Sequence, residues 1–276
     1  PRPAPAQHRR PRRRTPPARL GLVAVTAAVS LAACGDDDAD DAVVEPSATS
    51  DVTITDGTSD EPSTTSTGTG SASAESCDAF VEVSEQMAGG DPALLVAALQ
   101  DVVALVPEQW TGQATIVADG FEAAMDDPAA MQSAEFVSAL GYVSGYFVDN
   151  CDLATKLEVT GEDYAFTGIP AEIDAGRLGL RFVNVSAGSE PHELVILRRP
   201  DGDERTVADI AALDPETIFT DYEMIGVAFA EVPAAMMGLV VDVEPGEYVV
   251  ICNLPTGGDE ATPHAHEGII AAFTAS

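Results

Sequence analysis

The chain has 276 residues and is strongly acidic, with 46 Asp and Glu against 13 Lys and Arg and a formal net charge of −33 at pH 7. This length is enough to bury one large hydrophobic core or two smaller ones. A surface of this charge repels nucleic acid and anionic lipid, so we exclude a polynucleotide from the expected partners.

The first 33 residues have the pattern of a bacterial export signal. Seven of the 13 basic residues lie within the first 20 positions, and no acidic residue precedes Asp36. The apolar run that follows, Leu20 to Ala33, is too short to span a bilayer, which takes roughly 20 residues. The run ends in Leu31-Ala-Ala-Cys34-Gly35, which resembles the lipobox of bacterial lipoproteins.

This resemblance implies that residues 1–33 are a lipoprotein signal peptide and that Cys34 is acylated. We therefore expect a protein anchored by lipid on the extracytoplasmic side of a cell membrane. The alternative is an ordinary signal peptide in which the cysteine is incidental. The next segment, 34–75, contains 11 acidic residues, no basic ones and many Ser, Thr and Gly. It cannot bury enough apolar area to offset its ordering entropy, so we expect a disordered acidic linker.

Residues 76–152 have apolar side chains at helical spacing, and we expect a domain of three to four helices. One stripe is Leu95, Leu99, Val102 and Val103, and another is Phe136, Leu140, Val143 and Phe147. Asp91-Pro92, Pro107 and Asp127-Pro128 are typical of helix starts. Trp110 is expected in the core.

The two cysteines of this segment, Cys77 and Cys151, stand at its beginning and its end. Export into an oxidising compartment favours a disulfide between them. Such a bridge would close the two ends of the helical bundle.

Residues 153–276 show the period of two that is typical of strands, and we expect a β-sandwich. Between Thr206 and Leu213 the pattern predicts a short helix, followed by a loop to about Pro233. The expected strands lie at 157–160, 164–166, 178–185, 193–197, 238–243, 247–252 and 269–274.

Two stretches of this segment resemble the ligand regions of cupredoxins, the blue copper proteins. The first is Gly176 to Val185 followed by Pro191-His-Glu-Leu-Val-Ile-Leu197. The second is Pro245-Gly-Glu-Tyr-Val-Val-Ile-Cys-Asn-Leu-Pro255, followed by Pro263-His264 and Glu267-Gly-Ile269. The resemblance implies a cupredoxin-like Greek-key β-sandwich after the helical bundle. It also implies copper held by the imidazoles of two histidines and by one thiolate, namely His192, His264 and Cys252.

The sequence departs from the family pattern at three points. Ile269 stands where the family has a methionine as a weak axial ligand, and an aliphatic side chain there favours Cu(I). The loop from Cys252 to His264 is longer than in small cupredoxins. Glu193 follows the first histidine, where the family often has a neutral polar residue, and it either forms a local hydrogen bond or faces solvent.

Other interpretations of these residues stay open. Each could be structural: a histidine that caps a strand, a buried free thiol, or loop histidines in water. His264-Ala-His266 on a strand would put both rings on one face, as in cupins or zinc sites, and His266 is the alternative metal ligand. No nucleophile motif of a hydrolase is present, and multicopper oxidases need further His-x-His pairs, so we do not expect an enzyme.

Two functions follow from the sequence. The first is an extracytoplasmic, membrane-anchored lipoprotein that binds copper for single-electron transfer or copper handling. The second is a copper-free sandwich that serves as a cell-surface binding or scaffolding module. In either case the sequence does not name the redox or surface protein that would be the partner.

Overall fold

The computed structural model describes residues 71–188, 190–257 and 262–276. These residues all fall within one compact unit of the chain, Ala48–Ser276. The predicted signal peptide, the predicted acylation site Cys34 and most of the predicted linker lie outside the described residues. Among the helices that are described, none has both the length and the apolar character needed to cross a membrane.

The first part of the described chain is helical, as predicted. Asp91 begins a helix by accepting a hydrogen bond from the N–H of Ala93 through its side chain. Asp127 does the same for Ala129, but it starts only a short 3-10 helix, and the last α-helix begins after a separate cap, Ser133. The elements are α1 (Ala74–Met87), α2 (Pro92–Leu105), α3 (Glu108–Ala124), η1 (Pro128–Gln132) and α4 (Ala134–Asn150).

A disulfide joins Cys77 in α1 to Cys151, which directly follows α4. It confirms the pairing expected from the sequence. Because it links residues 74 positions apart, it restricts the unfolded chain strongly, and loops of this length correspond to on the order of 4 kcal/mol in the chain-entropy model. Trp110 packs against Tyr146 at the edge of the same apolar core, with the ring centroids 5.4 Å apart.

The strands of the described chain form two sheets. The four-stranded sheet has the order β2-β1-β4-β7, and the five-stranded sheet has the order β3-β9-β8-β5-β6. The pairs β1–β4 and β3–β9 are parallel, and the other pairs are antiparallel. The strands are β1 (Thr155–Glu162), β2 (Ala165–Thr167), β3 (Glu172–Ile173), β4 (Gly176–Asn184), β5 (His192–Arg198), β6 (Glu223–Ala230), β7 (Met236–Val243), β8 (Gly246–Ile251) and β9 (Ile270–Ala275).

The chain changes sheet after β2, β3, β4, β6 and β7, as in a Greek-key sandwich. The structure therefore confirms the predicted architecture: a small disulfide-closed helical bundle followed by a Greek-key β-sandwich.

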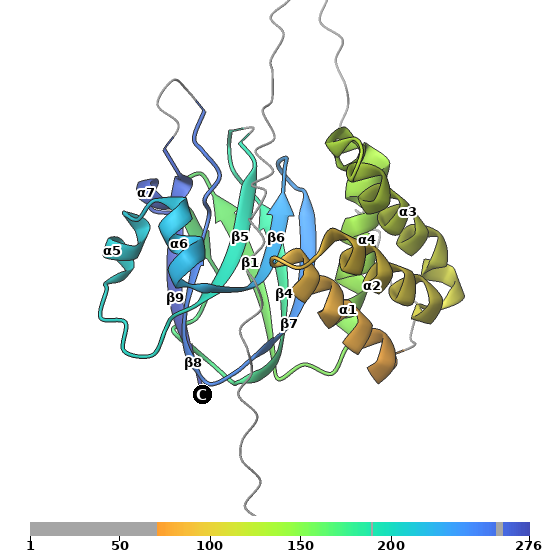
Figure 1. Cartoon of the computed structure of the whole chain (residues 1–276), viewed down its shortest axis with the longest axis horizontal. Helices are drawn as coiled ribbons and strands as arrows, with labels where there is room; N and C mark the ends of the chain where they lie inside the picture. Colours follow the sequence, from red (N-terminus) through yellow and green to blue (C-terminus); the bar gives the residue numbers. More distant parts are fainter. Residues whose placement is uncertain (1–70, 189, 258–261) are drawn as a thin grey trace, which may run out of the picture. The chain divides into compact units, whose positions relative to one another are not determined.

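Both sheets are covered on both faces, which explains why several strands are apolar without interruption. Leu239 and Val241 of β7 point into the core between the sheets, whereas Val240 belongs to the core of the helical bundle. On the five-stranded sheet, Val249 and Ile251 face away from the sandwich core and pack under three short helices. These are α5 (Val207–Ala211), α6 (Pro215–Asp221) and α7 (His264–Glu267). Figure 1 shows α1–α4 beside the four-stranded sheet and the short helices beside the other.

The contact between α4 and β7 is unusually close because β7 carries a glycine there. The N–H of Gly238 donates a hydrogen bond of 2.8 Å to the hydroxyl of Ser144, which in turn donates to the carbonyl oxygen of Leu140. A Cβ atom at Gly238 would lie 2.5 Å from the carbonyl oxygen of Ser144. The glycine is thus required by the packing of helix on sheet.

The prediction of a loop from Leu213 to about Pro233 is wrong. This stretch forms α6 and β6. Asp214 caps α6 and Pro215 occupies its first turn, the same pattern that marked an earlier helix start. Gly226 interrupts the apolar run of β6, and a Cβ atom there would lie 2.9 Å from Leu239 of the other sheet. Tight sheet packing, rather than a turn, explains this glycine.

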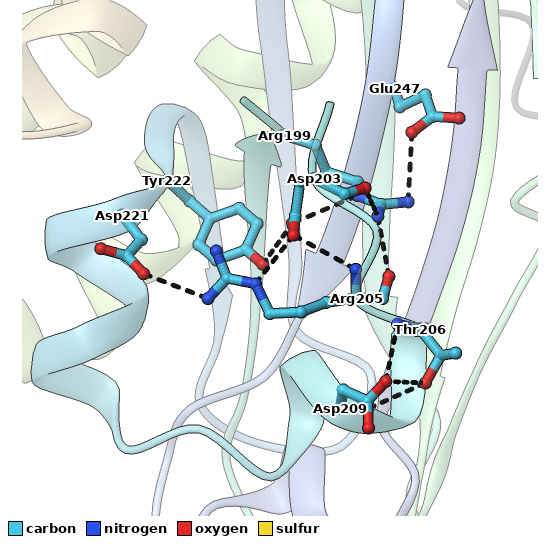
Figure 2. A network of polar contacts seen from close by, with 8 residues as sticks. All are labelled: Arg199, Asp203, Arg205, Thr206, Asp209, Asp221, Tyr222 and Glu247. Atoms are coloured by element: carbon cyan, nitrogen blue, oxygen red, sulfur yellow. Dashed lines mark hydrogen bonds and ion pairs between the residues drawn. The ribbon is translucent and has the colours of Figure 1, made fainter. Parts of the chain in front are cut away.

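A buried carboxylate, Asp203, organises the segment between β5 and α6 (Figure 2). Its side chain is 5% exposed and accepts hydrogen bonds from Arg205 Nε (2.8 Å) and from the hydroxyl of Tyr222 (2.7 Å). Arg199 donates to the backbone carbonyl oxygens of Asp203 and Arg205. The network therefore fixes the loop after β5 to the end of α6.

Asp203 should make the protein sensitive to acid. Burial alone would raise its pKa, but the hydrogen bonds from Arg205 and Tyr222 outweigh burial and lower the pKa from 3.8 to about 2. The ionised carboxylate thus contributes stability above pH 4 that is lost as the pH falls towards 2. We expect Asp203→Asn to lower the free energy of unfolding at pH 7 by roughly 2 kcal/mol and to flatten its decline between pH 4 and 2.

Urea unfolding at pH 7 and pH 3 measures both effects. The matched control is Asp201→Asn, because Asp201 is exposed on the same loop and should leave both values unchanged. An Asp203→Asn variant that loses as much stability as the parent protein between pH 4 and 2 would contradict the assignment.

Candidate metal centre

His192 is the first residue of β5, an interior strand of the five-stranded sheet that lies between β8 and β6. It pairs with Ala230 of β6. Its side chain is completely buried, yet neither ring nitrogen has a hydrogen-bond partner in the described structure. A buried polar side chain without partners costs free energy. We therefore expect the ring of His192 to interact with a group that the described chain does not supply.

Cys252 directly follows β8, the strand that pairs with β5. It is a free cysteine and is fully buried. The backbone N–H of Glu193 points at its sulfur, with 3.4 Å between nitrogen and Sγ. Glu193 also accepts a hydrogen bond of 2.9 Å from the N–H of Asn253 through its carboxylate. Two contacts from Glu193 in β5 therefore hold the segment that contains Cys252 and Asn253.

Glu193 thus has the local hydrogen bond that the sequence left open, and it does not face solvent, since it is only 8% exposed. Burial raises the pKa of its carboxyl from 4.5 to about 7, although the hydrogen bond from Asn253 lowers it.

His264 is the first residue of α7 and follows Pro263. The long loop before it folds back on itself, so that its two ends are antiparallel. The N–H of Thr256 donates to the carbonyl oxygen of Thr262 (2.8 Å), and that of His264 donates to Leu254 (2.9 Å). These hydrogen bonds bring His264 back to the neighbourhood of Cys252.

The three side chains meet at one end of the sandwich. One ligand atom from each of His192, Cys252 and His264 lies within 4.8 Å of the other two. Among the described residues, this is the group of His, Cys, Asp or Glu side chains whose spacing could hold a metal ion. Sγ of Cys252 is 3.4 Å from Nδ1 of His264. The two imidazole ring centroids are 5.0 Å apart, and the ring planes are inclined by 56°.

The three proposed ligand side chains are uncharged at pH 7 before any ion enters. Burial lowers the pKa of His192, and the neighbouring His264 lowers it further. Burial also lowers the pKa of His264, against the opposing effect of Glu190. Burial raises the pKa of the Cys252 thiol to about 12. At pH 7 the imidazoles are therefore neutral and able to donate lone pairs, whereas the thiol must lose its proton to bind a metal.

These residues fit copper by their chemistry. A thiolate and two imidazoles in a trigonal arrangement are the donor set of blue-copper centres, which can lack a strong axial ligand. A structural zinc site takes four protein ligands, and the described chain supplies three here. One of the two partnerless nitrogens of His192 could bind such an ion through its lone pair.

Ile269 lies between two of the proposed ligands. It is fully buried, its carbonyl oxygen accepts a hydrogen bond from the N–H of Cys252, and its N–H donates to the carbonyl oxygen of His264, both at 3.1 Å. His266 lies elsewhere: it is exposed on α7 and outside the cluster. Because α7 is a helical turn rather than a strand, the rings of His264 and His266 do not share a face.

Sequence reasoning missed one residue at this site, Glu190. Its Oε2 atom lies 3.2 Å from Nε2 of His264. An acidic residue two positions before the first histidine was visible in the sequence, but nothing in the pattern connects it to the second histidine 74 positions later. That contact depends on the conformation of the loop between β4 and β5.

Comparisons with known proteins locate similarities only among solved structures. No protein-family model and no curated protein matches this chain. Dithionite-reduced auracyanin from the photosynthetic bacterium Roseiflexus castenholzii aligns with 46% of this chain and 99% of its own, at 20% identity and a TM-score of 0.33.

Two further structures align in the same way. Rusticyanin from Thiobacillus ferrooxidans covers 45% of this chain and 79% of its own, at 15% identity and a TM-score of 0.28. An azurin from Methylomonas sp. strain J covers 45% and 98%, at 13% identity and a TM-score of 0.29. Scores this low do not establish membership of a family, so the copper assignment depends on the geometry of the three side chains.

Proposed function

We propose that this chain is a copper-binding protein that carries single electrons. The observation that supports this most is the convergence of His192, Cys252 and His264, three buried side chains whose donor atoms lie within 4.8 Å of one another. A copper ion would supply a one-electron couple, Cu(II)/Cu(I), to such a site.

The protein would contribute rigidity and exclusion of water. His192 and Cys252 are attached to paired strands of one sheet, and all three ligand side chains have no exposed surface. Glu193 holds the thiol loop through its backbone and its carboxylate. The donor atoms should therefore move little when the charge of the ion changes, and water has no open path to it.

The setting that we propose is extracytoplasmic and membrane-anchored. The lipobox resemblance at Cys34 supports a lipid anchor, and the acidic segment 34–75 supports a spacer between membrane and folded domain. We propose a carrier rather than an enzyme, because the three ligand side chains have no exposed surface in the described structure at which a substrate could reach the ion. The partner would be another redox protein.

Adding Cu(II) to the purified protein tests the proposal. We expect an intense visible absorption from thiolate-to-copper charge transfer, and we expect Cys252→Ser to abolish it while circular dichroism stays unchanged. The Cys77–Cys151 disulfide remains in that variant, but its sulfurs are oxidised and supply no thiolate for the band. A folded protein that gives no such band would overturn the proposal in favour of a copper-free surface module.

The residue at the axial position gives a second prediction. Ile269→Met would introduce a weak sulfur donor, which stabilises Cu(II) more than Cu(I) and lowers the reduction potential. Each tenfold gain in relative affinity for Cu(II) corresponds to about 59 mV. Redox titration followed in the visible band measures the shift, with Ile270→Met as the matched control at the adjacent position. An equal shift in both variants would mean that residue 269 does not adjoin the metal.

A further inference from the structure

The carboxylate of Glu190 lies beside Nε2 of His264, the ring nitrogen that does not face Cys252. His264 directs Nδ1 to the thiol, 3.4 Å from Sγ of Cys252, and Nε2 to Glu190, 3.2 Å from Oε2. The two atoms of the latter pair are within hydrogen-bonding distance but are not aligned for a hydrogen bond. The Glu190 side chain is 41% exposed, so a modest rotation can align them.

The backbone of Glu190 is fixed by a fully buried asparagine. The side-chain amide of Asn184 donates to the carbonyl oxygen of Glu190 (2.9 Å) and to that of Ala230 (3.0 Å). Its side-chain oxygen accepts from the N–H and the hydroxyl of Ser186. Every polar atom of this side chain is thus used to hold the loop before β5 in place. Glu190 therefore stands over His264 because the fold positions it there.

Once the two atoms are aligned, this contact would favour one position of the ring proton over the other. A neutral imidazole has one N–H and one free lone pair, and a carboxylate beside Nε2 favours the N–H at that nitrogen. Nδ1, which faces Cys252, is then left with its lone pair free. His192 provides a contrast, since neither of its nitrogens has a partner. The fold thus selects a tautomer for one histidine and not for the other.

We propose that Glu190 is a positioning residue for the metal centre, which holds His264 with Nε2 protonated and Nδ1 available as the ligand. The part of this proposal that concerns metal rests on the proposed copper function, whereas the part that concerns the tautomer does not. Carboxylates that accept from a ligating histidine orient the ring and increase its basicity, and their loss costs 10–100-fold in metal affinity in known sites.

The metal-free protein provides the first test. Nitrogen-15 NMR of the histidine rings at neutral pH distinguishes the two tautomers. We expect His264 to be the Nε2–H tautomer in the parent protein and in Glu190→Gln, whose amide oxygen can still accept, and a mixture in Glu190→Ala. The matched control is Glu162→Ala, which removes an exposed carboxylate from the end of β1 and should leave His264 unchanged.

Copper binding provides the second test. We expect Glu190→Ala to weaken Cu(II) affinity by about 10–100-fold, with Glu190→Gln losing much less and Glu162→Ala losing nothing. If the variant loses affinity for Cu(II) but not for Cu(I), each tenfold loss raises the reduction potential by about 59 mV. A general loss of structure would instead appear equally in Glu190→Gln and in the circular dichroism of both variants.

The two tests distinguish a failure of the inference about Glu190 from a failure of the proposed copper function. An unchanged His264 tautomer in a folded Glu190→Ala protein overturns the inference, whether or not copper binds. A changed tautomer in a protein that binds no copper sustains the effect of Glu190 on His264 and overturns the proposed function instead. Equal copper affinity in the parent protein and Glu190→Ala contradicts the role of Glu190 at the metal centre.

Discussion

The register between β5 and β8 is the constraint on which the metal centre depends. These strands pair antiparallel with Val195 opposite Ile251, so extension of the ladder brings the start of β5 beside the chain that leaves β8. His192 and Cys252 are 60 positions apart in sequence and become neighbours in this way. A slip of one residue would turn His192 to the other face of the sheet. The apolar faces of β5 and β8, buried on both sides, resist such a slip.

Burial makes this arrangement costly unless an ion is present. Two imidazoles and a thiol without exposed surface have lost their hydration, and three of their nitrogens lack a hydrogen bond in the described structure. The histidine nitrogens in the ligand pocket have no partner, whereas each polar atom of the equally buried Asn184 has one. Such a difference between two buried polar groups at the same end of the sandwich is expected when one of them is reserved for a ligand.

Sequence reasoning predicted the disulfide from the positions of two cysteines, whereas the three proposed ligands came from the resemblance to cupredoxins. The positions of Cys77 and Cys151 at the ends of a helical segment were sufficient for the pairing, and continuous apolar runs were sufficient for the strands. Other features depend on distant contacts that no pattern displays. The predicted loop from Leu213 to Pro233 includes Gly226, which lies in β6, where its lack of a side chain leaves room for Leu239 of the other sheet. The contact of Glu190 with His264 joins residues 74 positions apart, and nothing in the sequence around either residue indicates it.

X-ray absorption at the copper edge tests the central claim most directly, because it reports the ligand atoms themselves. For the copper-loaded protein, we predict one short copper–sulfur bond and two imidazole nitrogens, with the sulfur contribution absent in Cys252→Ser. Copper coordinated only by nitrogen and oxygen in the parent protein would contradict the account. It would mean that the ion is held at the surface, for example by the exposed His266, and that the convergence of the three buried side chains does not form a copper site.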